Sequence, residues 1–205
     1  FGARISLAVG CLAAVINLIV GTIYGGIAGY VGGKVDMIMM RVVDIIYSVP
    51  SMLYIVLIML IFGASVVSIM LGISITCWID MARIVRQQVK SLKEQEFTMA
   101  AFVLGASSSR ILLKHLLINT MGQIIVTVTL MVPQAIFTEA WLSFLGVGIS
   151  APMASWGTLA QDARELIMTY PMQTVYPMIA ICITIFSFNF VGEGLEKALD
   201  PKRKR

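Results

Sequence analysis

The sequence predicts an all-α protein, a polytopic bundle of helices that cross a membrane. Hydrophobic residues make up 59% of the 205 and charged residues only 13%, which is well outside the range of ordinary soluble domains. The mean hydropathy is strongly positive, and long runs of the chain carry no charge. This composition and charge pattern are typical of a membrane protein.

Five stretches are predicted to span the membrane. A helix needs about 20 apolar residues to cross the hydrocarbon. The charge-free run from Ile45 to Ile79 is too long for one crossing, and "FGAS" at 62–65 offers a turn that divides it. Pro133 and Glu139 interrupt the fourth stretch. The predicted spans are about 6–30, 45–62, 65–80, 116–145 and 174–192.

The placement of lysine and arginine predicts which side of the membrane each connection faces. Cytoplasmic loops carry an excess of these residues, and only Arg4 and Arg164 fall on the opposite side. We therefore expect 91–115 and the C-terminus to lie in the cytoplasm and 146–173 to lie outside. The basic residues on the cytoplasmic side are Lys34, Arg41, Arg83, Arg86, Lys90, Lys93, Arg110, Lys114, Lys197 and the tail at 202–205.

The two ends of the chain carry further expectations. The sequence begins at Phe1, without an initiator methionine or a charged leader. With five spans and a cytoplasmic C-terminus, this start lies outside, so we expect upstream sequence with one more N-terminal span. The tail "KRKR" at 202–205 is expected to bind the negative surface of the inner leaflet.

The connection at 91–115 predicts two short helices with a break between them. "SLKE" at 91–94 fits a capping box. Gly105 suits the left-handed residue that ends a helix, and Ser107 or Ser108 can cap the next helix, "SRILLKHLLIN", which runs into the fourth span. Small and apolar residues recur at helical spacing on one face of the first helix, namely Phe97, Ala100, Ala101, Leu104 and Gly105.

Two interpretations of this connection remain open. A face of small residues lets another backbone approach closely, so the first helix can dock in the groove of a cytoplasmic partner. Alternatively, the segment lies on the membrane as an amphipathic linker, with its lysines and arginines among anionic headgroups. The alanine and glycine spacing favours the partner, since a stripe that faces lipid would prefer leucine and phenylalanine.

The predicted external connection at 146–173 contains a short amphipathic helix within "SAPMASWGTLAQDARELI" at 150–167. Trp156 is a natural anchor at the membrane interface, and Ser155 can cap the helix. The helix is expected to lie in the interface. A second role for the same surface is docking of a solute-binding protein.

Polar side chains inside spans are costly, so they are usually functional or face the interior of the bundle. Glu139, near the outer end of the fourth span, has two open interpretations: pairing with helix ends or loop amides, or contact with a solute path. The other candidates for a translocation path or a polar position within the bundle are Gln134, Gln123, Asn17 and Asn189.

"EFTMAAFVLGASSSRILLKHLLIN" at 96–119 resembles the EAA loop of permease subunits of bacterial ABC importers, which has a glutamate, a pair of alanines and a glycine four residues later. Three further stretches narrow the resemblance to the oligopeptide, dipeptide and nickel branch, and to the second of its two homologous permeases. They are "FGARISLAVG" at 1–10, "EAWLSFLGVGISAPMASWGTL" at 139–159 and "FNFVGEGLEKALDP" at 188–201.

The chain departs from the family pattern at three positions. Ile118 stands where the family usually has proline, so the second helix is expected to run more smoothly into the span. Glu193 and Glu196 replace the usual aspartate and arginine of the closing motif.

The resemblance implies a type I ABC importer permease fold and a non-catalytic subunit that forms half of a translocation path for peptides. It implies four kinds of partner: a second homologous permease, two cytoplasmic ATPase subunits, an external solute-binding protein and the bilayer of the bacterial inner membrane. No nucleic acid is expected. On the family pattern the contact that couples the permease to the ATPases consists of Glu96, Ala100, Ala101 and Gly105, flanked by Arg110 and Lys114.

The chain itself is not expected to bind ATP or another cofactor. No glycine-rich Walker motif occurs in the sequence, so ATP and magnesium are assigned to the partner ATPases. The cysteines at 11, 77 and 182 share no ligand-like spacing with His115, so no metal site is expected.

Two alternatives to a peptide permease remain. The same role in an importer of nickel or another small solute is open, because nothing in the spans separates these solutes. An ion-coupled transporter or an intramembrane enzyme would need paired deep carboxylates or a nucleophile with its base, and the predicted spans contain neither.

Overall fold

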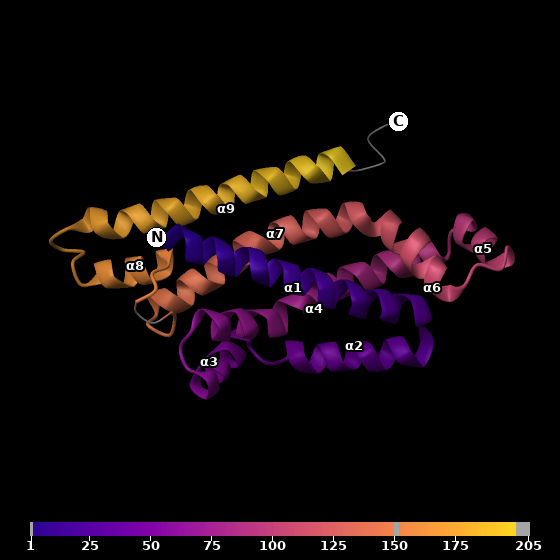
Figure 1. The fold of residues 1–205 in the computed structure, drawn as a ribbon, viewed down its shortest axis with the longest axis horizontal. Coiled ribbons are helices and arrows are strands. Elements are labelled where there is room, and N and C mark those ends of the chain that lie inside the picture. The colour runs from indigo at the N-terminus through magenta and orange to yellow at the C-terminus, as the bar shows by residue number, and fades with distance from the viewer. Residues whose placement is uncertain (1, 150–151, 200–205) are drawn as a thin grey trace.

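The computed structural model describes residues 2–149 and 152–199, and this part of the chain forms an elongated bundle of helices without strands (Figure 1). The predicted tail at 202–205 lies outside the described residues. The start of α1 and α8 lie at one end of the bundle and α5 at the other (Figure 1). The helices are α1 Gly2–Val31, α2 Gly33–Tyr47, α3 Ser51–Phe62, α4 Val66–Lys93, α5 Glu96–Val103, α6 Ser108–Arg110, the π-helix η1 Ile111–Leu116, α7 Leu117–Phe144, α8 Trp156–Arg164 and α9 Pro171–Leu199.

In the described part of the chain, four helical segments are long and apolar enough to cross a membrane: α1, α4, the continuous segment Ser108–Phe144, and α9. The pair α2 and α3 would make a fifth, although the two helices are bent by 76° at their junction. The prediction of an all-α membrane bundle is confirmed. The turn predicted at 62–65 is also present, since α3 ends at Phe62 and the Ser65 hydroxyl accepts from the Ser68 N–H at the start of α4.

The helix that carries the predicted third span, 65–80, continues past it to Lys93. Met81, Val85 and Val89 recur at helical spacing after Asp80 and are fully buried. This apolar face packs into the core, so the helix continues past the first charged residue. The capping box predicted at 91–94 is therefore wrong, since Ser91 lies inside α4.

The predicted second span, 45–62, is wrong as a single helix. α2 already ends at Tyr47, and α3 starts only at Ser51. Pro50 disfavours a helical conformation at the residue before it and cannot donate a backbone hydrogen bond, so the chain bends there. α3 has 12 residues, or about 18 Å, which is too short to cross the hydrocarbon alone.

Closely packed glycines join α1 to α4. A Cβ on Gly25 would lie 2.2 Å from the carbonyl oxygen of Ala82, and one on Gly29 would lie 2.7 Å from that of Arg86. A Cβ on Gly21 would lie 2.5 Å from the Cβ of Met81. This spacing of small residues every fourth position lets two membrane helices approach closely, and it places the backbones of α1 and α4 in contact.

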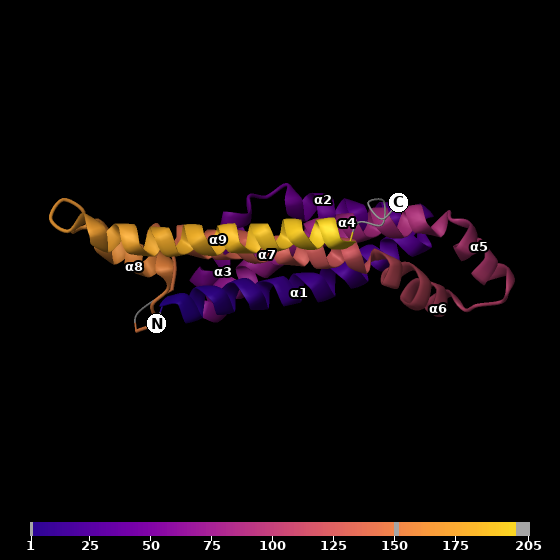
Figure 2. The same ribbon diagram turned by 90° about the horizontal axis from the view of Figure 1, so that it is seen from above.

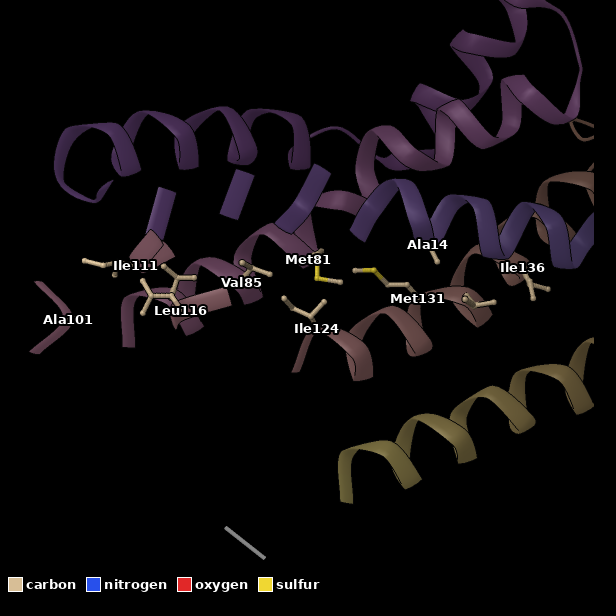
Figure 3. Close-up of a cluster of buried hydrophobic side chains, with 11 residues drawn as sticks. Ala14, Met81, Val85, Ala101, Ile111, Leu116, Ile124, Met131 and Ile136 are labelled. Atoms are coloured by element: carbon tan, nitrogen blue, oxygen red, sulfur yellow. The ribbon is translucent and has the colours of Figure 1, made fainter. Parts of the chain in front are cut away.

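The larger hydrophobic core forms a row along the bundle between α1, α4 and α7 (Figure 3). Met81 and Val85 of α4 lie opposite Ile124 and Met131 of α7. At one end the row reaches Ala101 of α5 (Figure 3). The helix of the predicted coupling segment is therefore part of the same core as the spans.

Ion pairs attach α2 to α4. Asp36 is buried, and its Oδ2 accepts from Arg86 Nη2 at 2.6 Å, while Arg86 Nε donates to the other carboxylate oxygen. The Nζ of Lys90 lies 3.7 Å from the same carboxylate. Only Asp36 and Val43 of α2 are buried, so these charged contacts add to a small apolar contact of this helix with the bundle.

Candidate functional site

The helix α5 ends in a tight turn that fixes its direction. Gly105 has a φ of +80°, the left-handed conformation predicted for it. Its N–H donates to the carbonyl of Phe102 at 3.0 Å, and the N–H of Ala106 donates to the carbonyl of Ala101 at 3.1 Å. These two bonds form a Schellman motif, which satisfies carbonyls at the helix end.

The inner face of α5 is fastened to α4 and to the core. Thr98 is buried, and its Oγ1 donates to the carbonyl of Leu92 at 2.8 Å. Ala101 is buried in the same cluster as Val89 and Ile111. α5 is thus a short, firmly seated helix beyond the ends of the other helices, as Figure 2 shows.

The outer face of α5 exposes large apolar side chains. Phe102 is 73% exposed, Val103 83% and Leu104 86%. Together with Phe97 and Met99, which are also exposed, we call these residues the apolar tip. Apolar side chains gathered on a protruding surface mark an interaction site.

The structure divides the face of small residues predicted for this helix. Ala100 and Gly105 of this face are exposed, whereas Ala101 points into the bundle. Glu96, which belongs to the predicted coupling contact, is exposed as well. Arg110 and Lys114, the predicted flanking residues, are exposed on the next helical segment. Sequence reasoning missed Met99, Phe102 and Val103, although the run "FVL" just before Gly105 was a visible signal.

The distribution of charge around the apolar tip bears on the two interpretations left open. No lysine or arginine occurs between Glu94 and Ser109. A helix that lies on an anionic membrane presents basic residues beside its apolar face. The tip therefore suits an apolar groove on a protein better than it suits anionic headgroups.

The second predicted helix runs without interruption into the fourth span, as expected. Ser107 occupies its N-cap position, but its side chain makes no capping hydrogen bond. The six residues of η1 are π-helical, a form often found at functional sites. Ile118 lies in α7 immediately after this segment.

Glu139 lies at the opposite end of the bundle and is fully buried. Its carboxyl oxygens accept from Ser143 Oγ at 2.8 Å and from Ser6 Oγ at 3.1 Å. The Ser6 hydroxyl in turn accepts from the N–H of Trp156 at 3.1 Å. This network joins α1, α7 and α8. It favours the structural interpretation of Glu139 over contact with a solute path.

The helix α8 begins with the cap predicted at Ser155. The Ser155 hydroxyl accepts from the N–H of Thr158 at 3.1 Å, and the Thr158 hydroxyl accepts from the N–H of Ser155 at 2.8 Å. This reciprocal pair is a capping box, with threonine in place of the usual glutamate or glutamine. It fixes Trp156 beside the Glu139 network.

Replacing Glu139 by alanine is expected to destabilise the protein by roughly 2 kcal/mol, because the hydroxyls of Ser6 and Ser143 lose their buried acceptor. Thermal unfolding of the purified protein in detergent measures this change. Glu165→Ala removes an exposed carboxylate near the same end of the bundle and should leave the unfolding temperature unchanged. Equal stability of the two variants would contradict the structural role.

The other polar residues predicted within the spans do not gather in one place. Asn17 is buried, and its Oδ1 has no hydrogen-bond partner among the described residues. Gln123 is exposed and Asn189 half-buried. Gln134 is exposed and lines a cavity.

This cavity has a volume of about 430 Å³ and lies at the bend between α2 and α3, against α4 and α7. Asp80 lines it from the middle of α4. The sequence pattern does not reveal Asp80 as a cavity residue, because the first charge after a long apolar run indicates the end of a span. The residues that line the cavity are Tyr47, Ser48, Val49, Pro50, Ser51, Ile55, Ile73, Thr76, Cys77, Asp80, Gln134 and Thr138.

Residues 21–205 match the family described as binding-protein-dependent transport system inner membrane component. Over 204 residues the chain is 52% identical to the oligopeptide transport system permease protein OppC of Bacillus subtilis, covering 100% of this chain and 67% of the relative. It is 48% identical over 206 residues to the dipeptide transport system permease protein DppC of the same species, covering 100% and 64%. The chain spans about two thirds of the length of these curated relatives.

Solved structures of more distant proteins share the fold. A chain of the MetNI methionine ABC transporter, in inward-facing conformations, superposes with a TM-score of 0.77 at 18% identity, covering 97% of this chain and 94% of that chain. A chain of an amino acid ABC transporter superposes with a TM-score of 0.72 at 14% identity, covering 96% and 92%. The expected permease fold is confirmed.

Proposed function

The chain belongs to the family of binding-protein-dependent transport system inner membrane components, and on this premise we propose that it is one of two homologous permeases of an ATP-driven peptide importer. Its relatives are named as oligopeptide and dipeptide transport permeases. Its role in the complex is to form half of the translocation path. ATP and magnesium bind to the partner ATPases.

The apolar tip of α5 is the observation that carries this proposal. Phe102 and Leu104 are largely exposed, while Thr98 and Ala101 fasten the helix to the bundle. A domain closure can move the spans only through an element that is rigidly joined to both bodies. The tip meets this condition on the permease side, which supports its assignment as the contact with a cytoplasmic ATPase.

The distribution of basic residues supports a cytoplasmic position for the end that carries α5. Arg83, Arg86, Lys90 and Lys93 all lie in the last part of α4, next to α5. Cytoplasmic connections are enriched in lysine and arginine. The end that carries Glu139 and α8 then faces outward, where the solute-binding protein docks.

Reconstitution of the complete importer tests the function. The full-length permease is combined with its partner permease, both ATPases and the binding protein in liposomes, and uptake of a radiolabelled tripeptide is measured. We expect uptake that requires ATP and the binding protein. A complex that accumulates a nickel chelate and no peptide would assign the solute to the alternative class.

A further inference from the structure

We propose that the cavity at the bend between α2 and α3 is a solute-binding site in which Asp80 receives a primary ammonium group of the passing solute. This inference rests on the proposed function, and it names the group of the solute that the path recognises. The cavity lies beside the middle of α4 and is lined by four helices: α2, α3, α4 and α7.

Among the residues that the structure describes, Asp80 is the only charged one that lines the cavity. Within the described part of the chain, its carboxylate makes no side-chain hydrogen bond or ion pair. A charged group in the middle of a membrane helix is costly unless a partner is provided. A cationic solute group would supply this partner.

The nearest basic residue on the same helix, Arg83, already forms an ion pair with another carboxylate. Arg83 Nη2 binds Asp44 Oδ1 at 3.0 Å, and its guanidinium lies 4.5 Å from the centre of the Tyr47 ring. These two contacts hold Arg83 toward α2. Arg83 attracts the Asp80 carboxylate electrostatically but does not line the cavity, so Asp80 supplies the charge of the cavity wall.

Three hydroxyl groups of the cavity wall are oriented as acceptors. Thr138 Oγ1 donates to the carbonyl of Gln134 at 2.8 Å, and Ser48 Oγ donates to that of Ile45 at 2.7 Å. Thr76 Oγ1 donates to the carbonyl of Ile73 at 3.4 Å. Because each proton is used within its own helix, the oxygen lone pairs remain to accept hydrogen bonds.

This set of groups matches a primary ammonium, which has three donors and no acceptor. The C-terminal end of α2 also borders the cavity through Tyr47 and Ser48, and a helix C-terminus carries a partial negative charge. Broken membrane helices in transporters bind cations with such ends. A volume of about 430 Å³ lies within the range of pockets that bind small-molecule ligands.

The native Cys77 lines the cavity beside Asp80 and provides a direct probe. In the complete importer, with Cys11 and Cys182 replaced by serine, the rate of Cys77 modification is measured with aminoethyl and sulfonatoethyl methanethiosulfonate. These reagents are similar in size and opposite in charge. We expect the ratio of the two rates, cationic over anionic reagent, to be roughly ten-fold higher with Asp80 present than without its charge.

Asp80→Asn is expected to remove this preference, and Asp80→Glu to retain it. The ratio of the two rates cancels any change in the reactivity of the thiol itself. Glu196→Gln, which removes an exposed carboxylate on α9, is the matched control and should leave the ratio unchanged. An unchanged ratio in Asp80→Asn would overturn the proposal. A second, independent variant is Gln134→Lys, which adds an ammonium to the same cavity and should lower the ratio.

Protection of Cys77 by peptides identifies the bound group. Trialanine and N-acetyl-Ala-Lys-Ala each carry one primary ammonium, at the N-terminus and on the side chain respectively, and N-acetyl-trialanine carries none. We expect protection by one or both ammonium peptides and none by N-acetyl-trialanine; equal protection by all three would overturn the proposal. Uptake by the unmodified importer is measured in parallel, so a charge preference at Cys77 without peptide uptake refutes the proposed function alone.

Discussion

Replacing Phe102 and Leu104 together by aspartate is expected to abolish binding of the ATPase subunits while the bundle stays folded. Both side chains are largely exposed in the isolated chain, so the change costs the fold little. In the proposed complex they would lie in an apolar groove, where two unpaired carboxylates lose several kcal/mol of hydration. We expect affinity to fall at least roughly 100-fold, measured by copurification and by ATPase activity stimulated by the binding protein.

Met168→Asp is the matched control for this variant. Met168 is 95% exposed, and it lies after α8, at the end of the bundle away from α5. The same introduction of charge at this position should leave ATPase binding intact. Normal copurification and stimulated hydrolysis in the double variant would show that the apolar tip is not the contact.

Gly25→Ala is expected to separate α1 from α4 and to lower the stability of the protein by about 3 kcal/mol. The added Cβ would lie 2.2 Å from the carbonyl oxygen of Ala82. This oxygen belongs to a helix backbone and cannot rotate away, so the two helices must move apart. The unfolding temperature in detergent should fall by roughly 6–12 °C.

The neighbouring glycine provides the control. A Cβ on Gly26 would meet its nearest atom, Leu117 Cδ2, at 3.6 Å, which is an ordinary contact. Gly26→Ala should therefore leave the unfolding temperature unchanged or raise it slightly, because alanine favours a helix. Similar losses in both variants would mean that the close approach of α1 and α4 contributes little.

The local features of the fold were predictable from the sequence, because each has a cause within a few residues. The left-handed Gly105 and the cap at Ser155 follow from side-chain chemistry next to the backbone. The apolar runs of α1, α7 and α9 were recognisable as spans because each is long enough to match the thickness of the bilayer. The bend at Pro50 also has a local cause but was not predicted. The long charge-free run around the proline indicated one continuous span.

Other features depend on contacts between distant parts of the chain and were not predictable. The inward orientation of Ala101 follows from its packing against η1, and the continuation of α4 beyond Asp80 follows from burial of Met81 and Val85. A single sequence does not state which face of a short helix meets the core. Glu139 and Ser6 are 133 positions apart in the sequence. For the same reason, the sequence did not decide between the two interpretations of Glu139.

The length of α4 sets the height of the apolar tip above the bilayer. α4 has 28 residues, about 42 Å, against a hydrocarbon thickness of about 30 Å. Its basic residues, from Arg83 to Lys93, all lie toward α5, so the excess length extends on that side. In the proposed orientation the tip therefore stands beyond the headgroup layer, where a partner can bind it without displacing lipid. Changes in membrane composition or thickness should then leave that contact largely unaffected.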